Sequence, residues 1–130
     1  MTSVAVTFGK ANADRRAALV GYLPAGFPTV DGAIEAARAM AAAGADVIEI
    51  GLPYSDPLMD GPVIAEAVHR ALTAGTKVAD VLRTVEAVAA AGVPVLVMTY
   101  WNPVDHYGVT AFGQAQLDQF CVQAPRAIAP

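Results

Sequence analysis

The sequence predicts an α/β protein in which short parallel strands alternate with helices. Hydrophobic residues make up 55% of the 130 residues and charged residues 15%, which suits a parallel sheet whose strands are buried on both faces. Short apolar runs alternate with longer segments in which apolar residues recur at helical spacing. Strands and helices in this alternation form βαβ units, and such units build a parallel sheet.

The first unit begins with a buried strand at residues 18–23, which ends at Pro24. Thr29 has the side chain of a helix N-cap, and Gly44 stands where a glycine commonly follows the last helical turn. Between them, one helix face is formed by Val30, Ile34, Ala37 and Ala41. The sequence therefore predicts a strand, a loop and a helix that ends just before Gly44.

The second unit begins with a strand at residues 47–50, followed by an irregular stretch at 52–61. Pro62 is placed as the first residue of a helix, where its missing N–H costs nothing, and Gly75 ends that helix. A leading helix at residues 4–16 has only a weak pattern.

A further helix has its apolar face between Val78 and Val88, and it stops at Gly92. The third strand is expected at residues 95–98 and a polar and aromatic loop at 99–102. A partial helix is expected at about residues 112–122. The carboxyl ends of parallel strands are where ligands bind in α/β folds.

Composition excludes several classes of function. The net charge is −4 and Lys and Arg do not cluster, so nucleic acid is not an expected partner. The single cysteine, Cys121, favours a reducing compartment, and the first residues do not resemble a secretory signal, so a cytoplasmic location is expected. The uncharged run between Glu86 and Asp105 is interrupted by Gly92–Pro94, so a membrane span is not predicted.

Glu49 is the strongest candidate for chemistry. It interrupts an apolar strand near its carboxyl end, where burying an unpaired carboxylate would be costly. Alternation places Val47 and Glu49 on one face of the strand and Ile48 and Ile50 on the other. If the isoleucines pack against helices, Glu49 points to the opposite, ligand-binding side. The alternative is a structural carboxylate held by an Arg or by backbone amides.

Asp60 lies in the loop behind the same strand, and by itself it is best explained as a turn residue or a helix cap ahead of Pro62. Asp56, before Pro57, has the same explanation. No metal-ligand spacing, Ser–His–Asp arrangement or glycine-rich phosphate loop appears, so no metal or cofactor is expected. His69 is expected on a helix surface, and a lone loop histidine, His106, carries little weight.

A long motif at residues 45–62 changes this assessment. It contains the strand glutamate, then Gly-Leu-Pro-Tyr-Ser-Asp-Pro and Asp-Gly-Pro, and it resembles the signature of tryptophan synthase α subunits. Residues 21–28, 98–103 and 107–109 resemble the first and third strands of that family with their loops. The resemblance covers about residues 15–112.

The resemblance implies a partial (β/α)8 barrel, with about the first three βα units. Residues 1–112 are then expected to be the N-terminal half of the barrel, and residues 113–130 a non-matching tail that is partly helical or disordered. A complete barrel has eight units and about 250 residues. Residues 1–130 alone are therefore expected to be inactive.

The resemblance also implies a reaction, the retro-aldol cleavage of indole-3-glycerol phosphate to indole and glyceraldehyde 3-phosphate. Glu49 matches the glutamate that shuttles protons to indole C3 and from the side-chain hydroxyl. Asp60 matches the aspartate that holds the indole N–H and stabilises the developing positive charge. The pocket around the indole ring is matched by Tyr22, Met98 and Tyr100.

A partner is implied as well: the tryptophan synthase β subunit, which carries pyridoxal phosphate and receives indole in an αββα assembly. The α subunit itself uses no cofactor. The expected contact residues are Pro53, Asp56 and Pro57, together with Asn102 in the loop after the third strand.

Two other functions are alternatives to the lyase subunit. Another phosphate-binding barrel of tryptophan or histidine biosynthesis has less support, because the paired Glu49 and Asp60 motif is particular to the α subunit. A non-catalytic fragment that at most contacts the β subunit is the other alternative.

Overall fold

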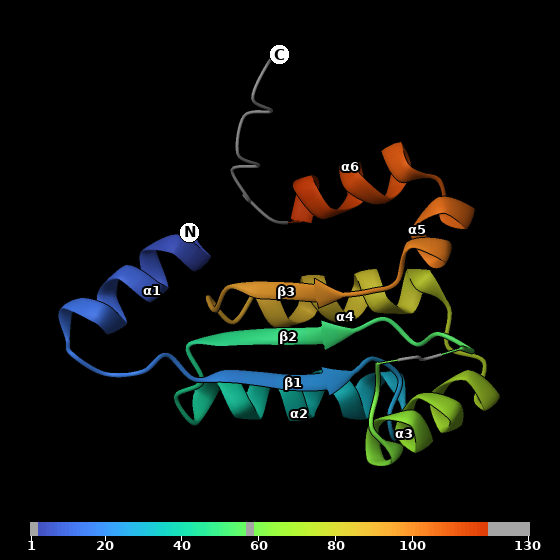
Figure 1. The fold of residues 1–130 in the computed structure, drawn as a ribbon, viewed down its shortest axis with the longest axis horizontal. Helices are drawn as coiled ribbons and strands as arrows, with labels where there is room; N and C mark the ends of the chain where they lie inside the picture. The colour runs from blue at the N-terminus through green and yellow to red at the C-terminus, as the bar shows by residue number, and fades with distance from the viewer. Residues whose placement is uncertain (1–2, 57–58, 120–130) are drawn as a thin grey trace.

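The chain forms a three-stranded parallel sheet with helices packed against it (Figure 1). A computed structural model describes residues 3–56 and 59–119. The strands lie across the sheet in the order β1 (Val20–Pro24), β2 (Val47–Gly51) and β3 (Val95–Met98). The predicted α/β class with parallel strands is confirmed.

Strand pairing sets the side chains of the sheet in rows. Tyr22 of β1 pairs with Glu49 of β2, which pairs in turn with Leu96 of β3. In the next row of the same face, Gly51 pairs with Met98. All three strands run in the same direction, so their carboxyl ends meet at one edge of the sheet.

Three helices connect the strands: α2 (Val30–Ala42), α3 (Pro62–Thr73) and α4 (Val78–Ala89). The hydroxyl of Thr29 accepts a hydrogen bond from the Gly32 N–H at 3.0 Å, which caps α2 as predicted. Pro62 occupies the first turn of α3. Gly44 follows α2 with a φ of 107°, a conformation that glycine adopts at little cost. The boundaries of these helices therefore agree with the sequence prediction.

The core lies between the sheet and two of the helices. Ile48 and Ile50 are fully buried and pack with Ala37 of α2 and with Val81 and Val85 of α4. Figure 1 shows α2 and α4 running along this side of the strands. The isoleucines therefore face the helices, and Glu49 is directed to the other face.

On the face that carries Glu49, apolar strand residues remain partly uncovered within the part of the chain that the structure describes. Val20 remains 39% exposed and Leu96 38% exposed, although both are apolar strand residues. Val47 lies on the same face but is fully buried, at the start of the central strand between its two neighbours. The outer edges of β1 and β3 are unpaired within the part of the chain that the structure describes.

The described residues also form α1 (Val4–Ala13), α5 (Trp101–Tyr107) and α6 (Val109–Gln119). The loop expected at residues 99–102 is therefore shorter, because α5 already begins at Trp101. Pro103 is compatible with this start, since the first-turn N–H groups of a helix have no intrahelical partner. His106 lies in α5 instead of a loop. No helix in the described residues has the length and apolar character needed to span a membrane.

An ion pair joins the starts of β1 and β2. The Arg16 guanidinium donates to both carboxylate oxygens of Asp46 at 2.7 Å, and the Leu19 N–H donates to the same carboxylate at 2.8 Å. These hydrogen bonds, those from Arg16 foremost, lower the pKa of Asp46 to about 2. The pair helps to set the alignment of β1 and β2, and with it the pairing of Tyr22 with Glu49.

Candidate functional site

The two carboxylates come from β2 and from the loop that follows it. Glu49 is half-buried on the face opposite the helices, two residue pairs from the carboxyl end of the sheet. Asp60, at the end of the loop, is also half-buried. The N-cap of α3 is Gly61, and no side chain caps this helix. The capping role considered for Asp60 is therefore not observed.

Tyr22 crosses from β1 over the end of β2. A Cβ atom added at Gly51 would lie 2.8 Å from Cζ of the Tyr22 ring and still closer to its hydroxyl. Such a contact is shorter than van der Waals packing permits, so only glycine leaves room for the tyrosine ring there. Gly51 thus allows Tyr22 to extend along the carboxyl edge of the sheet.

Four of the predicted residues interact electrostatically at this edge of the sheet: Tyr22, Glu49, Asp60 and Tyr100. Burial, followed by the negative charges of Asp60 and Glu49 and by the nearby Tyr100, raises the pKa of Tyr22 to about 12. Each of these effects disfavours a phenolate. Tyr22 therefore stays protonated at neutral pH, as a neutral ring and hydroxyl beside two carboxylates. Met98 is half-buried in the row next to Glu49, opposite Gly51.

Tyr100 holds the loop that carries Asp60. Its hydroxyl accepts a hydrogen bond from the Met59 N–H at 3.0 Å. Its ring lies 5.1 Å from the ring of Tyr54, at an interplanar angle of 35°. Tyr54 belongs to the aromatic position of the motif, but the sequence assigned it no role, because its contacts are made by residues more than 40 positions away.

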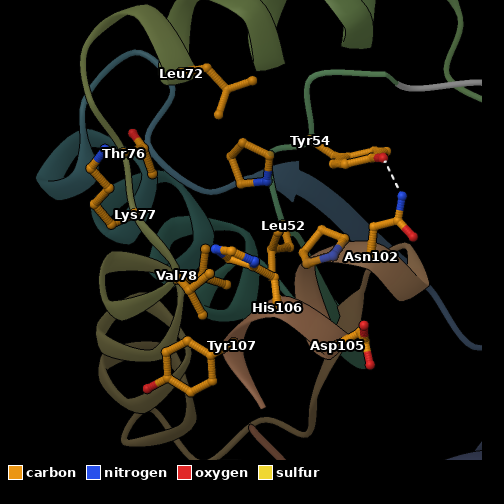
Figure 2. Close-up of a pocket in the computed structure, with 13 residues that line it drawn as sticks. Leu52, Tyr54, Leu72, Thr76, Lys77, Val78, Asn102, Asp105, His106 and Tyr107 are labelled. Carbon is orange, nitrogen blue, oxygen red and sulfur yellow. Dashed lines mark hydrogen bonds between the residues drawn. The ribbon is translucent and has the colours of Figure 1, made fainter. Parts of the chain in front are cut away.

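The residues predicted to contact a partner lie beside this site. A cavity of about 570 Å³ lies between the residues just after β2, the start of α4, and α5 (Figure 2). Pro53 and Asn102 both line it, and the Asn102 side-chain amide donates to the Tyr54 hydroxyl at 2.8 Å. Asp56 is exposed and accepts a hydrogen bond from Ser55, and Pro57 lies outside the described residues.

The cavity and the carboxylate site are distinct. Glu49 and Asp60 do not line the cavity. His106 does point into the cavity, toward Val78 (Figure 2). His69 is exposed on α3, as predicted. No group of three or more His, Cys, Asp or Glu residues suited to a metal ion occurs within residues 3–56 and 59–119.

Known proteins are similar to this chain in sequence. The chain is 61% identical to the tryptophan synthase alpha chain of Salinispora arenicola over 114 residues, which are 88% of this chain and 43% of the relative. That of Thermobifida fusca is 59% identical over 112 residues, 86% of this chain and 42% of the relative. The chain thus spans less than half the length of these relatives.

Solved structures give the same result. The aminoacrylate-bound form of tryptophan synthase from M. tuberculosis superposes with a TM-score of 0.88 at 48% identity, over 91% of this chain and 49% of that one. The alpha subunit from Legionella pneumophila superposes with a TM-score of 0.85 at 35% identity, over 92% of this chain and 46% of that one. Residues 8–124 match the family described as tryptophan synthase alpha chain. The chain therefore belongs to the tryptophan synthase alpha chain family, of which it represents an N-terminal portion.

Proposed function

We propose that this chain supplies the acid–base half of an indole-3-glycerol-phosphate lyase, the α subunit of tryptophan synthase. The observation that carries the proposal is the convergence of Glu49 and Asp60 on Tyr22 at the carboxyl edge of the sheet. In barrels of this class, catalytic groups are held at that edge. Membership of the family suggests the reaction, and the match of Glu49 and Asp60 to the family motif suggests their roles.

The reaction breaks one carbon–carbon bond and needs two proton transfers. A proton is added at indole C3, and another is removed from the hydroxyl next to it, so that the side chain leaves as an aldehyde. A single carboxyl group that gives the first proton and takes the second is returned to its starting state. Glu49 is assigned this role, since it is half-buried on the open face of the sheet.

Asp60 is assigned a different role. Protonation at C3 places positive charge on the indole nitrogen, and a carboxylate that accepts the indole N–H stabilises that charge. The ring itself needs a flat, largely apolar surface. Tyr22, Met98 and Tyr100 are assigned to this surface, because all three are half-buried at or just after the carboxyl ends of β1 and β3.

The rest of the substrate site is expected in the part of the relatives' sequence that this chain does not match. The phosphate of the substrate is commonly bound in such barrels by loops after the seventh and eighth strands, and this chain has three strands in the described residues. We propose residues 1–112 as the half-barrel unit and residues 113–130 as a tail; α6 (Val109–Gln119) spans this boundary, and the family match runs to residue 124.

A chimeric enzyme tests the function directly. Residues 1–112 replace the matching segment of the Salinispora arenicola relative, and indole release from indole-3-glycerol phosphate is measured. If the catalytic carboxylates are in place, kcat/KM should stay within about tenfold of the parent enzyme. A chimera that folds and binds substrate but releases no indole would contradict the proposal.

The proposed partner is the β subunit in an αββα assembly, in the cytoplasm. Asp56 is exposed three residues after Pro53, and Pro53 and the exposed Asn102 both line the cavity. The alternative is a non-catalytic fragment that is able at most to contact the β subunit. Indole release by the chimera, with and without β subunit, separates the two.

Replacing the loop residues should affect the partner more than the chemistry. In the chimera, Asp56→Ala is expected to weaken mutual activation with the β subunit about tenfold, because a charge at the edge of an interface is lost. Pro57→Ala should act in the same direction by loosening the loop. Titrating the β subunit while following indole release measures both. Asp31→Ala, an exposed change on α2, is the control, and equal losses with and without the β subunit would assign Asp56 to catalysis instead.

A further inference from the structure

A chain of contacts links α5 to the residue before Asp60. The Asn102 side-chain amide donates to the Tyr54 hydroxyl at 2.8 Å. The Tyr54 ring packs on the Tyr100 ring at a centroid distance of 5.1 Å. The Tyr100 hydroxyl then accepts the Met59 N–H at 3.0 Å. Figure 2 shows the first of these contacts, with Tyr54 and Asn102 at the wall of the cavity.

This arrangement fixes Asp60 from one side. Met59 is 82% exposed, so its side chain gives the loop little packing of its own. The hydrogen bond from its N–H to Tyr100 is therefore an anchor one residue before the carboxylate. Tyr100 can serve as an anchor only if its ring is held, and Tyr54 packs against that ring.

We propose that Tyr54 is a positioning residue for Asp60 and that it acts through Tyr100. The proposal rests on the function proposed above. Small displacements of a catalytic group reduce turnover strongly, and catalytic groups depend on supporting residues that lock their geometry. The ring of Tyr54 provides the support, and its hydrogen bond with Asn102 fixes the ring against α5.

Hydrogen exchange tests the anchor in the 130-residue chain itself. Exchange of the Met59 amide is measured by mass spectrometry with residue-level fragmentation, and the Ile50 amide serves as an internal reference. Tyr100→Phe removes the acceptor, so Met59 should exchange about tenfold faster while Ile50 is unchanged. Tyr54→Leu should accelerate Met59 similarly, and Tyr54→Phe, which keeps the ring, should restore most of the protection.

The control is Phe8→Leu, an exposed aromatic residue of α1. It loses a ring of similar size and should leave Met59 unchanged. Unchanged exchange of Met59 in Tyr54→Leu would overturn the proposal. So would equal acceleration of Met59 and Ile50, because it would show a general loss of stability instead of a local anchor.

Kinetics of the chimera tests the consequence for Asp60. Tyr54→Leu should lower kcat about tenfold with little change in KM, since charge on the indole ring develops only in the transition state. Tyr54→Phe should recover most of kcat. A rise in KM alone would overturn the positioning role. If the unsubstituted chimera is inactive, the proposed function fails, while the exchange of Met59 still decides whether Tyr54 anchors the loop.

Discussion

Replacing Glu49 by Gln in the chimera is expected to lower kcat/KM about 10²–10⁴-fold, the usual contribution of a general acid–base group. The amide keeps the volume of the side chain but cannot shuttle a proton. Glu49 is half-buried on the open face of the sheet, away from the Ile48 and Ile50 core, so the substitution should not disturb packing. Indole release measures the loss, and thermal unfolding confirms that the fold is intact.

Asp60→Asn should reduce turnover strongly by a different route. The amide can still accept a hydrogen bond, but it carries no negative charge to stabilise the indole cation, and removing one such contact commonly costs about 10²–10³-fold in kcat. Glu86→Gln and Asp31→Asn, both exposed on helices, are the matched controls and should behave as the parent. Normal turnover by either active-site variant would remove that residue from the mechanism.

A polypeptide of residues 1–130 by itself is expected to release no measurable indole. Glu49 lies on an open sheet face, where Val20 and Leu96 are more than a third exposed, and Asp60 lies in the loop beside it. A barrel of this class closes with eight strands, and the described residues provide three. Without closure, water is not excluded from the carboxylates and the phosphate has no binding loops, so both chemistry and affinity are lost.

The same polypeptide is expected to self-associate. Unpaired strand edges and an exposed apolar face promote pairing with other chains, and each Å² of apolar surface removed from water contributes about 25 cal/mol. Sedimentation velocity across a range of concentrations measures the association. Leu96→Lys, which places a charge on an edge strand, should reduce it without changing the helical content. A monodisperse chain that turns over the substrate would contradict both expectations.

Local chemistry explains why much of the fold could be predicted. Thr29 caps α2 through a hydrogen bond to a residue three positions away, and Pro62 starts α3 because a first-turn residue needs no N–H. The direction of Glu49 also follows from local geometry, since alternate residues of a strand point to opposite faces. The family motif then indicated which carboxylates to consider. Their catalytic roles remain predictions for the chimera to test.

Other features were decided only by the tertiary structure. The start of α5 at Trp101 replaces an expected loop, because Pro103 is tolerated in a first turn. The passage of Tyr22 over Gly51 depends on the register of β1 and β2. The contacts of Tyr54 join residues 46 and 48 positions apart, with Tyr100 and Asn102. Such contacts have no signal in local spacing, because they exist only after the sheet has brought the carboxyl ends of its strands together.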